Sequence, residues 1–186
     1  MKQLQFLSRW WLASIAVLMV GLIQVPAHAA DAKTIDRDSR AALQSLYASS
    51  PGAKALGEKA KAIPVFPSVL KAGLIVGAQG GDGALIEKGQ TVGFYNTAAV
   101  SVGLQAGAQE FGYAMFFMTD QVLNDFKKSN KFEIGVGPTV VFLDAGAAKD
   151  LNTLTAKADV YAIIFNQKGL MAGIGLQGSK ITKLDK

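Results

Sequence analysis

The sequence of 186 residues contains no cysteine, a single histidine and only two tryptophans, both before residue 12. Without cysteine the chain has no disulfide, no thiolate nucleophile, and no zinc–thiolate or iron–sulfur site. One histidine cannot build a multi-histidine metal site. Charged residues make up 18% of the chain and apolar residues 50%, a balance that is typical of a packed globular domain. We therefore expect no metal, no cofactor and little catalytic chemistry.

The first 29 residues have the order of a secretory signal peptide. Lys2 and Arg9 form a basic start, residues 10–25 are almost entirely apolar, and residues 26–29 end in a small-residue A-x-A site. A retained membrane anchor is the alternative, although the apolar run is shorter than the roughly 20 residues of a spanning helix. We expect cleavage near Ala29, a single domain over residues 30–186, and a periplasmic or secreted protein. Cleavage would lower the formal charge from +5 to +3 and remove the histidine.

Helical and β-type patterns divide the rest of the chain. Apolar residues at helical spacing predict a first helix from about Ile35 to Tyr47, and Ser50 with Pro51 predicts the start of a second that ends near Ala62. A third, inserted helix is predicted over Asp120–Lys128, with Asp120 as its cap. Short β-type runs separated by glycine, asparagine and aspartate predict strands near 72–79, 83–88, 91–95, 98–107, 110–118, 132–136, 139–143, 158–166 and 169–177. Turns are expected over 80–83, 87–90 and 166–169.

Glycines inside these strands indicate the shape of the sheet. Several are spaced four apart, so the two members of each pair share a face of a strand. Glycine weakens a strand unless the strand must bend sharply. The sequence therefore predicts an α+β fold: a strongly curved antiparallel β-sheet or small β-barrel, with the N-terminal helices packed against it and one inserted helix.

Motifs for catalysis are weak. Ser68 and Lys71 match the S-x-x-K pattern of penicillin-binding enzymes, but the S-D-N and K-T-G motifs that accompany it are absent. The glycine clusters do not complete a phosphate-binding loop. Candidate carboxylates such as Glu87 and Glu110 lack the tryptophan-lined groove usual for sugar hydrolysis. We therefore expect that the protein is not an enzyme.

Lysines near a Pro64–Pro67 turn provide the candidate binding site. Lys54, Lys61 and Lys71 flank this turn, and Val65 and Phe66 within it are expected to be exposed. Basic residues beside an apolar wedge suit an anionic membrane surface. The alternative is a solvated lysine face above ordinary core residues. The mild charge and sparse aromatic residues argue against nucleic acid as a partner.

The chain resembles the SYLF domain family over about residues 32–186. The resemblance is carried by the order and spacing of several short segments: 60–63, 71–74, 80–83, 103–110, 135–138, 161–165, 168–174 and 176–178. The sequence departs from the family where it has Gly93-Phe94-Tyr95-Asn96 in place of Gly-Trp-Ser.

This resemblance implies a non-enzymatic lipid-binding module. Eukaryotic members bind phosphoinositide membranes and some bind actin, whereas bacterial members are exported. It therefore implies a phospholipid-binding protein of the bacterial cell envelope, where it would not meet actin. The alternatives are a structural or protein-interaction module of the periplasm, with an envelope protein as partner, and a soluble carrier with an apolar cavity.

Overall fold

The computed structural model of the protein describes residues 31–102, 107–129, 131–150, 157–169, 175–176 and 178–186. The predicted signal peptide and most of the predicted strand 169–177 lie outside the described residues. The described elements in chain order are α2 (Ala32–Ser49), α3 (Pro51–Lys59), β1 (Ile63–Gly73), β2 (Val76–Glu87), β3 (Gln90–Val102), β4 (Gly107–Phe117), α4 (Asp120–Lys128), β5 (Lys131–Glu133), β6 (Val140–Asp144), the 3-10 helix η1 (Ala147–Asp150), β7 (Val160–Gly169) and β8 (Lys180–Leu184).

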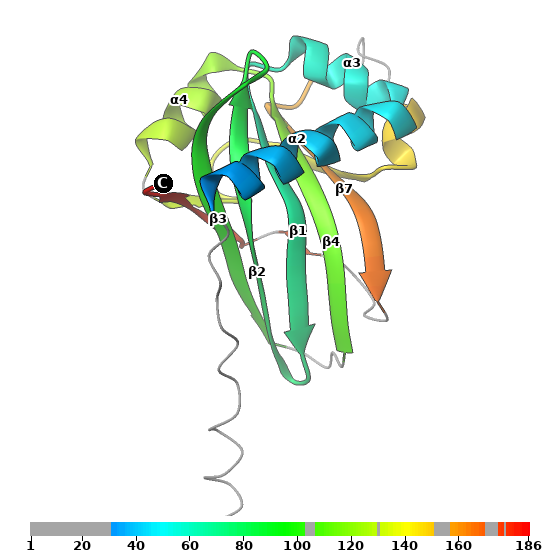
Figure 1. Ribbon diagram of the computed structural model, residues 1–186, viewed down its shortest axis with the longest axis vertical. Coiled ribbons are helices and arrows are strands. Elements are labelled where there is room, and N and C mark those ends of the chain that lie inside the picture. Colours follow the sequence, from blue (N-terminus) through cyan, green and yellow to red (C-terminus); the bar gives the residue numbers. More distant parts are fainter. Residues whose placement is uncertain (1–30, 103–106, 130, 151–156, 170–174, 177) are drawn as a thin grey trace, which may run out of the picture.

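The strands form one eight-stranded sheet in the order β5-β8-β3-β2-β1-β4-β7-β6. The sheet curls strongly into a half-barrel, and β1 and β2 extend as a long hairpin beyond the helices (Figure 1). Every neighbouring pair is antiparallel except β6–β7, which is parallel. The fold is therefore the predicted α+β arrangement of a strongly curved sheet with helices packed against it, with one parallel pair at its edge.

Both N-terminal helices begin at capping residues, of which Ser50 was predicted and Asp31 was not. Asp31 caps α2 by accepting a hydrogen bond from the backbone N–H of Thr34, at 2.7 Å. Ser50 caps α3 in the same way, and Pro51 occupies its first turn. The inserted helix α4 has the predicted bounds and buries Val122, Leu123 and Phe126, but its N-cap is Thr119 and not the expected Asp120. Local sequence signals thus set all three of these helices.

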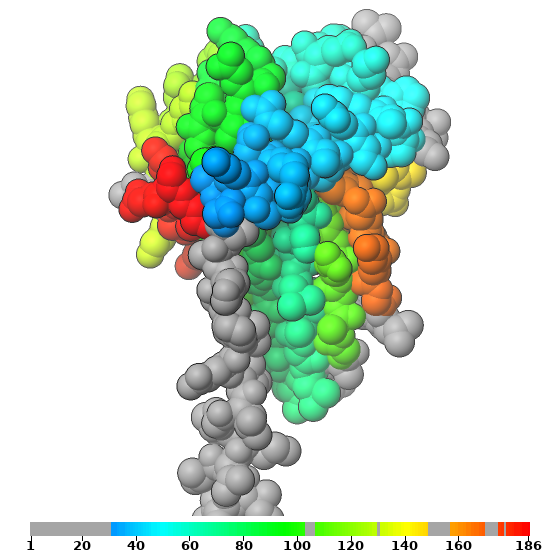
Figure 2. Space-filling model, viewed as in Figure 1, coloured from blue at the N-terminus to red at the C-terminus, as the bar shows by residue number. Residues whose placement is uncertain are grey.

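Apolar side chains cover both faces of the upper part of the sheet. We call the face that packs against α2 and α3 the outer face, and the opposite one, which packs against α4, the inner face. The outer core contains Leu46, Leu56, Val65 and Phe116. The inner core is rich in aromatic rings and includes Phe66, Tyr95, Phe111, Tyr113, Phe117, Phe126 and Phe132. Helices cover only part of the outer face, and the lower half of the sheet projects below α2 (Figure 2).

The predicted turn at Gly80–Gly83 is wrong, because these residues lie inside β2. They pair without interruption with Ala98–Tyr95 of β3. Glycine is needed here for close approach: a Cβ atom at Gly81 would lie 2.3 Å from the backbone oxygen of Ser68, and one at Gly83 would lie 2.3 Å from that of Val65. These glycines accommodate the bulge in β1 and do not reverse the chain.

The predicted hairpin at 166–169 is also wrong, because β7 continues through Gly169. Asn166 adopts a left-handed conformation with φ of +52°. At this point the register to β4 shifts, so that β7 contains one more residue than β4 between two paired positions. Asparagine here makes a bulge and not a turn. The predicted turn over 87–90 is confirmed, with Lys88 and Gly89 at positive φ.

Candidate functional site

The predicted lysines lie at two separate ends of the sheet. Lys54 on α3 and Lys61 just after it are exposed at the helix-covered end, and Lys61 pairs with Asp120 at 3.2 Å. Lys71 lies eight residues along β1 from Ile63, a span of about 26 Å in an extended strand. The structure therefore does not bring Lys71 together with the other two lysines.

The expected exposure of Val65 and Phe66 is wrong, since both side chains are fully buried. Val65 belongs to the outer core, and the ring of Phe66 stacks on Tyr113 at 4.8 Å between centroids on the inner face. The two prolines flanking them do not break the strand, because β1 continues through both. Successive strand residues point to opposite faces, and here both faces are covered.

An apolar surface that was not predicted lies at the far end of the β1–β2 hairpin. Leu74, Ile75 and Val76, which we call the hairpin tip, are 68%, 61% and 60% exposed. The tip is the part of the hairpin furthest from the helices (Figure 1). No charged residue occurs in residues 72–81. Three adjacent large apolar side chains in solvent are unusual for a protein surface and make the hairpin tip a candidate interaction site.

Paired glycines shape this tip. Gly73 and Gly77 face one another across the two strands, and a Cβ atom at Gly73 would lie 2.3 Å from the Cα of Gly77. The turn between them uses Leu74 and Ile75, where hairpins usually have asparagine or glycine. The prediction of one strand over 72–79 is therefore wrong, because this segment contains the end of β1, a turn and the start of β2. The sequence signal for the hairpin tip is an apolar run with no turn residue at its centre.

Further apolar side chains extend from the tip onto the lower outer face. Leu70, Val100 and Val102 are 54%, 76% and 81% exposed. They lie near the tip because Val102 pairs with Val76 and Val100 pairs with Ala78. The hairpin tip is therefore continuous with an apolar surface of β1, β2 and β3.

The inner face at the same level is polar. Lys71 pairs in register with Gln79 on β2 and with Gln109 on β4, and all three side chains are buried. Gln79 donates to the hydroxyl of Ser179 at 3.0 Å. The side-chain oxygen of Gln109 is buried without a hydrogen-bond partner. Lys71 is thus enclosed on the polar inner face, away from the lysines near α3.

Ser68 and Lys71 do not form a nucleophile–base pair. Both lie in β1, where residues three apart point to opposite faces, and the S-x-x-K chemistry needs them one helical turn apart. Ser68 instead donates to the carboxylate of Glu110 at 2.8 Å on the outer face. The described residues contain no cluster of three or more histidine, cysteine or acidic side chains placed to hold a metal.

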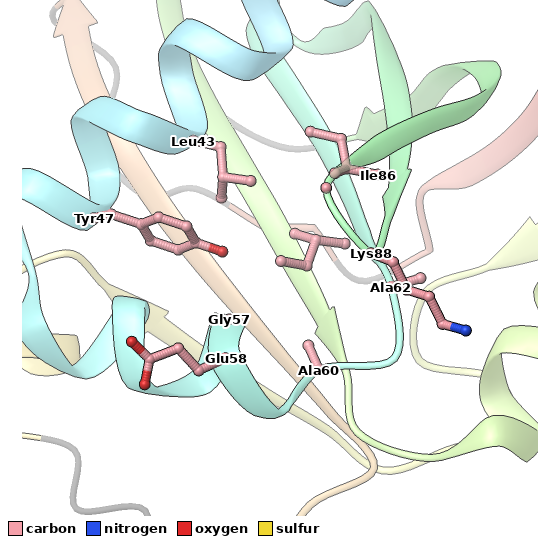
Figure 3. A pocket seen from close by; sticks show the side chains of 10 residues that line it. Leu43, Tyr47, Gly57, Glu58, Ala60, Ala62, Ile86 and Lys88 are labelled. Atoms are coloured by element: carbon pink, nitrogen blue, oxygen red, sulfur yellow. The ribbon is translucent and has the colours of Figure 1, made fainter.

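A cleft of about 380 Å³ lies between the two N-terminal helices and the ends of β1 and β2. Figure 3 shows Leu43 and Tyr47 of α2 facing Ile86 of β2 across it. Glu58 of α3 and Lys88 of the β2–β3 turn lie at its rim. No residue of the predicted site lines this cleft. No helix in the described part of the chain is both long and apolar enough to cross a membrane.

Comparison with known proteins identifies one family. Residues 98–186, from within β3 to the last residue, match the Ysc84 family, which is described as a Las17-binding protein actin regulator. No curated protein matches the chain. The matched segment includes β4, α4, β7 and β8, and it agrees with the resemblance to the SYLF domain. Residues 98–186 of the chain are thus similar to the Ysc84 (SYLF) family.

Proposed function

We propose that the protein is a non-enzymatic lipid-binding module that docks on phospholipid membranes through its hairpin tip. The observation that carries the proposal is the exposure of Leu74, Ile75 and Val76 at the far end of the hairpin, within the uncharged stretch 72–81. Burying apolar side chains of this size in acyl chains is favourable by about 1.5–3 kcal/mol each when burial is complete. The tip can enter a membrane without removing a charged group from water.

Backbone pairing supports the same proposal. Unpaired backbone N–H and C=O groups oppose entry into hydrocarbon. In the hairpin, residues 70–73 pair in continuous register with residues 77–80, so the strands bring few unpaired backbone groups with them. The backbone N–H of Leu74 also bonds to the carbonyl of Val76, at 3.3 Å. Shallow insertion of the tip therefore exposes little polar backbone to the acyl region.

Charge adds a weaker contribution. Lys54 and Lys61 lie on the helix-covered end, so they do not face the bilayer that the tip enters. We propose that a positive net charge gives only a modest preference for anionic lipid. The signal-like order of residues 1–29 supports a location in the cell envelope.

A protein partner is the second candidate. The family description names Las17 and actin, which are proteins, and exposed Val100 and Val102 extend the apolar surface over the sheet. An apolar sheet surface can equally cover a protein partner. In this case, an envelope protein would occupy the lower outer face and lipid would be irrelevant.

Vesicle sedimentation tests the proposal. Protein produced from the full-length sequence is mixed with phosphatidylcholine vesicles and with vesicles that also contain phosphatidylglycerol. We expect sedimentation with both, somewhat more with the anionic vesicles at low salt. A protein that stays in the supernatant with both vesicle types at low salt would contradict membrane binding. Recovery of one stoichiometric protein by crosslinking in cells, without lipid, would favour the second candidate.

A further inference from the structure

We infer that the cleft between α2, α3 and the β1–β2 ends binds a single-chain amphiphile with an anionic head, of the fatty-acid class (Figure 3). This site is separate from the hairpin tip, because β1 and β2 reach the cleft with the ends opposite to the tip. The inference does not depend on membrane docking.

The size and walls of the cleft suit one acyl chain. Leu43, Ile63 and Ile86 line it from three different elements, and the small side chains of Ala60 and Ala62 leave space between them. Its volume of about 380 Å³ is at the low end of the range of about 300–1,000 Å³ for small-molecule pockets. A single chain of moderate length fits such a space, whereas a phospholipid with two long chains does not.

Tyr47 supplies a hydrogen-bond donor inside the cleft. Its ring packs against Phe116 at 6.5 Å between centroids, and its hydroxyl points into the cleft in Figure 3. This hydroxyl makes no hydrogen bond with any residue in the described part of the chain. Burial, and to a lesser degree the charge of Glu58, raises the pKa of Tyr47 to about 12, so the phenol keeps its proton at neutral pH. A carboxylate oxygen would provide the missing acceptor.

Gly57 makes room for this hydroxyl. A Cβ atom at Gly57 would lie only 2.0 Å from the Tyr47 oxygen and 2.5 Å from the adjacent ring carbon. Glycine in the middle of a helix is unfavourable relative to alanine. Glycine at position 57 therefore allows the Tyr47 ring to occupy its position in the wall of the cleft.

Lys88 supplies the positive charge at the rim. It adopts a left-handed conformation, with φ of +50°, in a two-residue turn where asparagine or aspartate is the usual choice before glycine. Its side chain is exposed and forms no ion pair with a described residue. Figure 3 shows Glu58 on the same side of the cleft as Tyr47 and Lys88 on the opposite side, so the rim is positive on the Lys88 side. The head of an anionic amphiphile that accepts from Tyr47 is therefore expected to extend toward Lys88 and away from Glu58.

Calorimetric titration with decanoate, below its micelle concentration, tests the inference on protein made from the full-length sequence. We expect saturable binding of one decanoate per chain. Tyr47→Phe keeps the ring but removes the donor, so affinity should fall at least about ten-fold. Lys88→Asn keeps a residue suited to the turn but removes the positive charge. It should lower the affinity for decanoate about three-fold and leave the affinity for uncharged decanol unchanged. Gly57→Ala should abolish binding, because it displaces the Tyr47 ring.

Controls separate this site from the hairpin tip. A chain with Leu74, Ile75 and Val76 all changed to serine should bind decanoate as the wild type does. Absence of saturable binding by a chain with a cooperative melting transition would overturn the inference. So would equal decanoate affinity in the wild type and Tyr47→Phe. A protein that binds decanoate but not vesicles would contradict only the membrane proposal. A protein that binds vesicles but not decanoate would contradict only the inference about the cleft.

Discussion

Changing the hairpin tip from apolar to polar should release the protein from membranes. The perturbation replaces Leu74, Ile75 and Val76 together by serine. Full burial of such side chains is worth about 1.5–3 kcal/mol each. Their exposed fractions of 60–68% leave at least about 1 kcal/mol per side chain to be gained on insertion. The three together contribute about 3 kcal/mol or more, so the vesicle partition coefficient should fall by at least about 100-fold.

Quantitative sedimentation over a range of lipid concentrations measures this partition coefficient. Apolar insertion is not screened by salt, so the ratio between wild type and variant should be the same at about 0.1 M and about 0.5 M salt. Both proteins share the same N-terminal segment, so the ratio reports the tip alone. The melting temperature should change little, because the tip side chains are mostly in solvent.

Val136→Ser provides a matched control. Its side chain is 63% exposed, close to the 60% of Val76, but it lies outside the β1–β2 hairpin. It should leave the partition coefficient within about two-fold of the wild type, since scattered exposed apolar side chains carry no special role. The reasoning is refuted if the triple variant binds within three-fold of the wild type, or if Val136→Ser loses as much affinity as the triple variant.

Three further predictions concern stability. Gly83→Ala places a Cβ atom 2.3 Å from a backbone oxygen of β1 and should lower the free energy of unfolding in urea by about 1–3 kcal/mol. In Gly80→Ala the nearest neighbour of the new Cβ atom is at 3.6 Å, so the loss should be less than about 1 kcal/mol. Equal losses in the two variants would contradict the packing argument. Tyr113→Phe and Thr97→Val each leave a buried hydroxyl without its hydrogen-bond partner at 2.7 Å, so each should lower the free energy of unfolding by about 1–3 kcal/mol. The double variant should lose less than the sum of the two single losses. Strict additivity of the losses would speak against this hydrogen bond. Burial raises the pKa of Tyr47 from near 10 to about 12, so the contribution of its neutral form to stability is fully present below pH 10 and is lost as the pH rises to 12. The unfolding free energy of the wild type, measured relative to that of Tyr47→Phe, should therefore fall over that window, and a constant difference would argue against the shift.

The helices and the character of the sheet could be predicted because their signals are local. Ser50 with Pro51 starts α3 whatever lies around it, and the apolar spacing of α4 gives its buried face directly. Glycines inside apolar runs indicated a bent sheet because only strong curvature explains their repeated use. The curled sheet of the structure confirms this prediction.

The errors arose where neighbours across the sheet decide the conformation. Gly80–Gly83 has the composition of a turn, and only the close approach of β1 explains why β2 continues through it. Val65 and Phe66 lie between prolines, which suggested a surface turn. Their burial depends on helices covering one face and aromatic rings covering the other, which no local pattern reveals.

The candidate site could be predicted only in part. The lysines were found by composition, but their separation depends on the length and direction of β1. The hairpin tip gave a weak signal, since an apolar run normally indicates a buried strand and here two of its residues form the turn. The cleft joins residues from 43 to 89 and therefore has no contiguous sequence signal.

The strand order also constrains how the chain folds. The hairpins β1–β2 and β2–β3 join neighbours in sequence and can form early, because little loop entropy is lost. In contrast, β3 pairs with β8 through contacts such as Phe94 with Leu184, which are far apart in the chain. Until β8 has been synthesised, β3 offers an open edge to other chains. A partly made chain is thus open to mispairing along β3 until β8 emerges, and loss of β8 should promote aggregation.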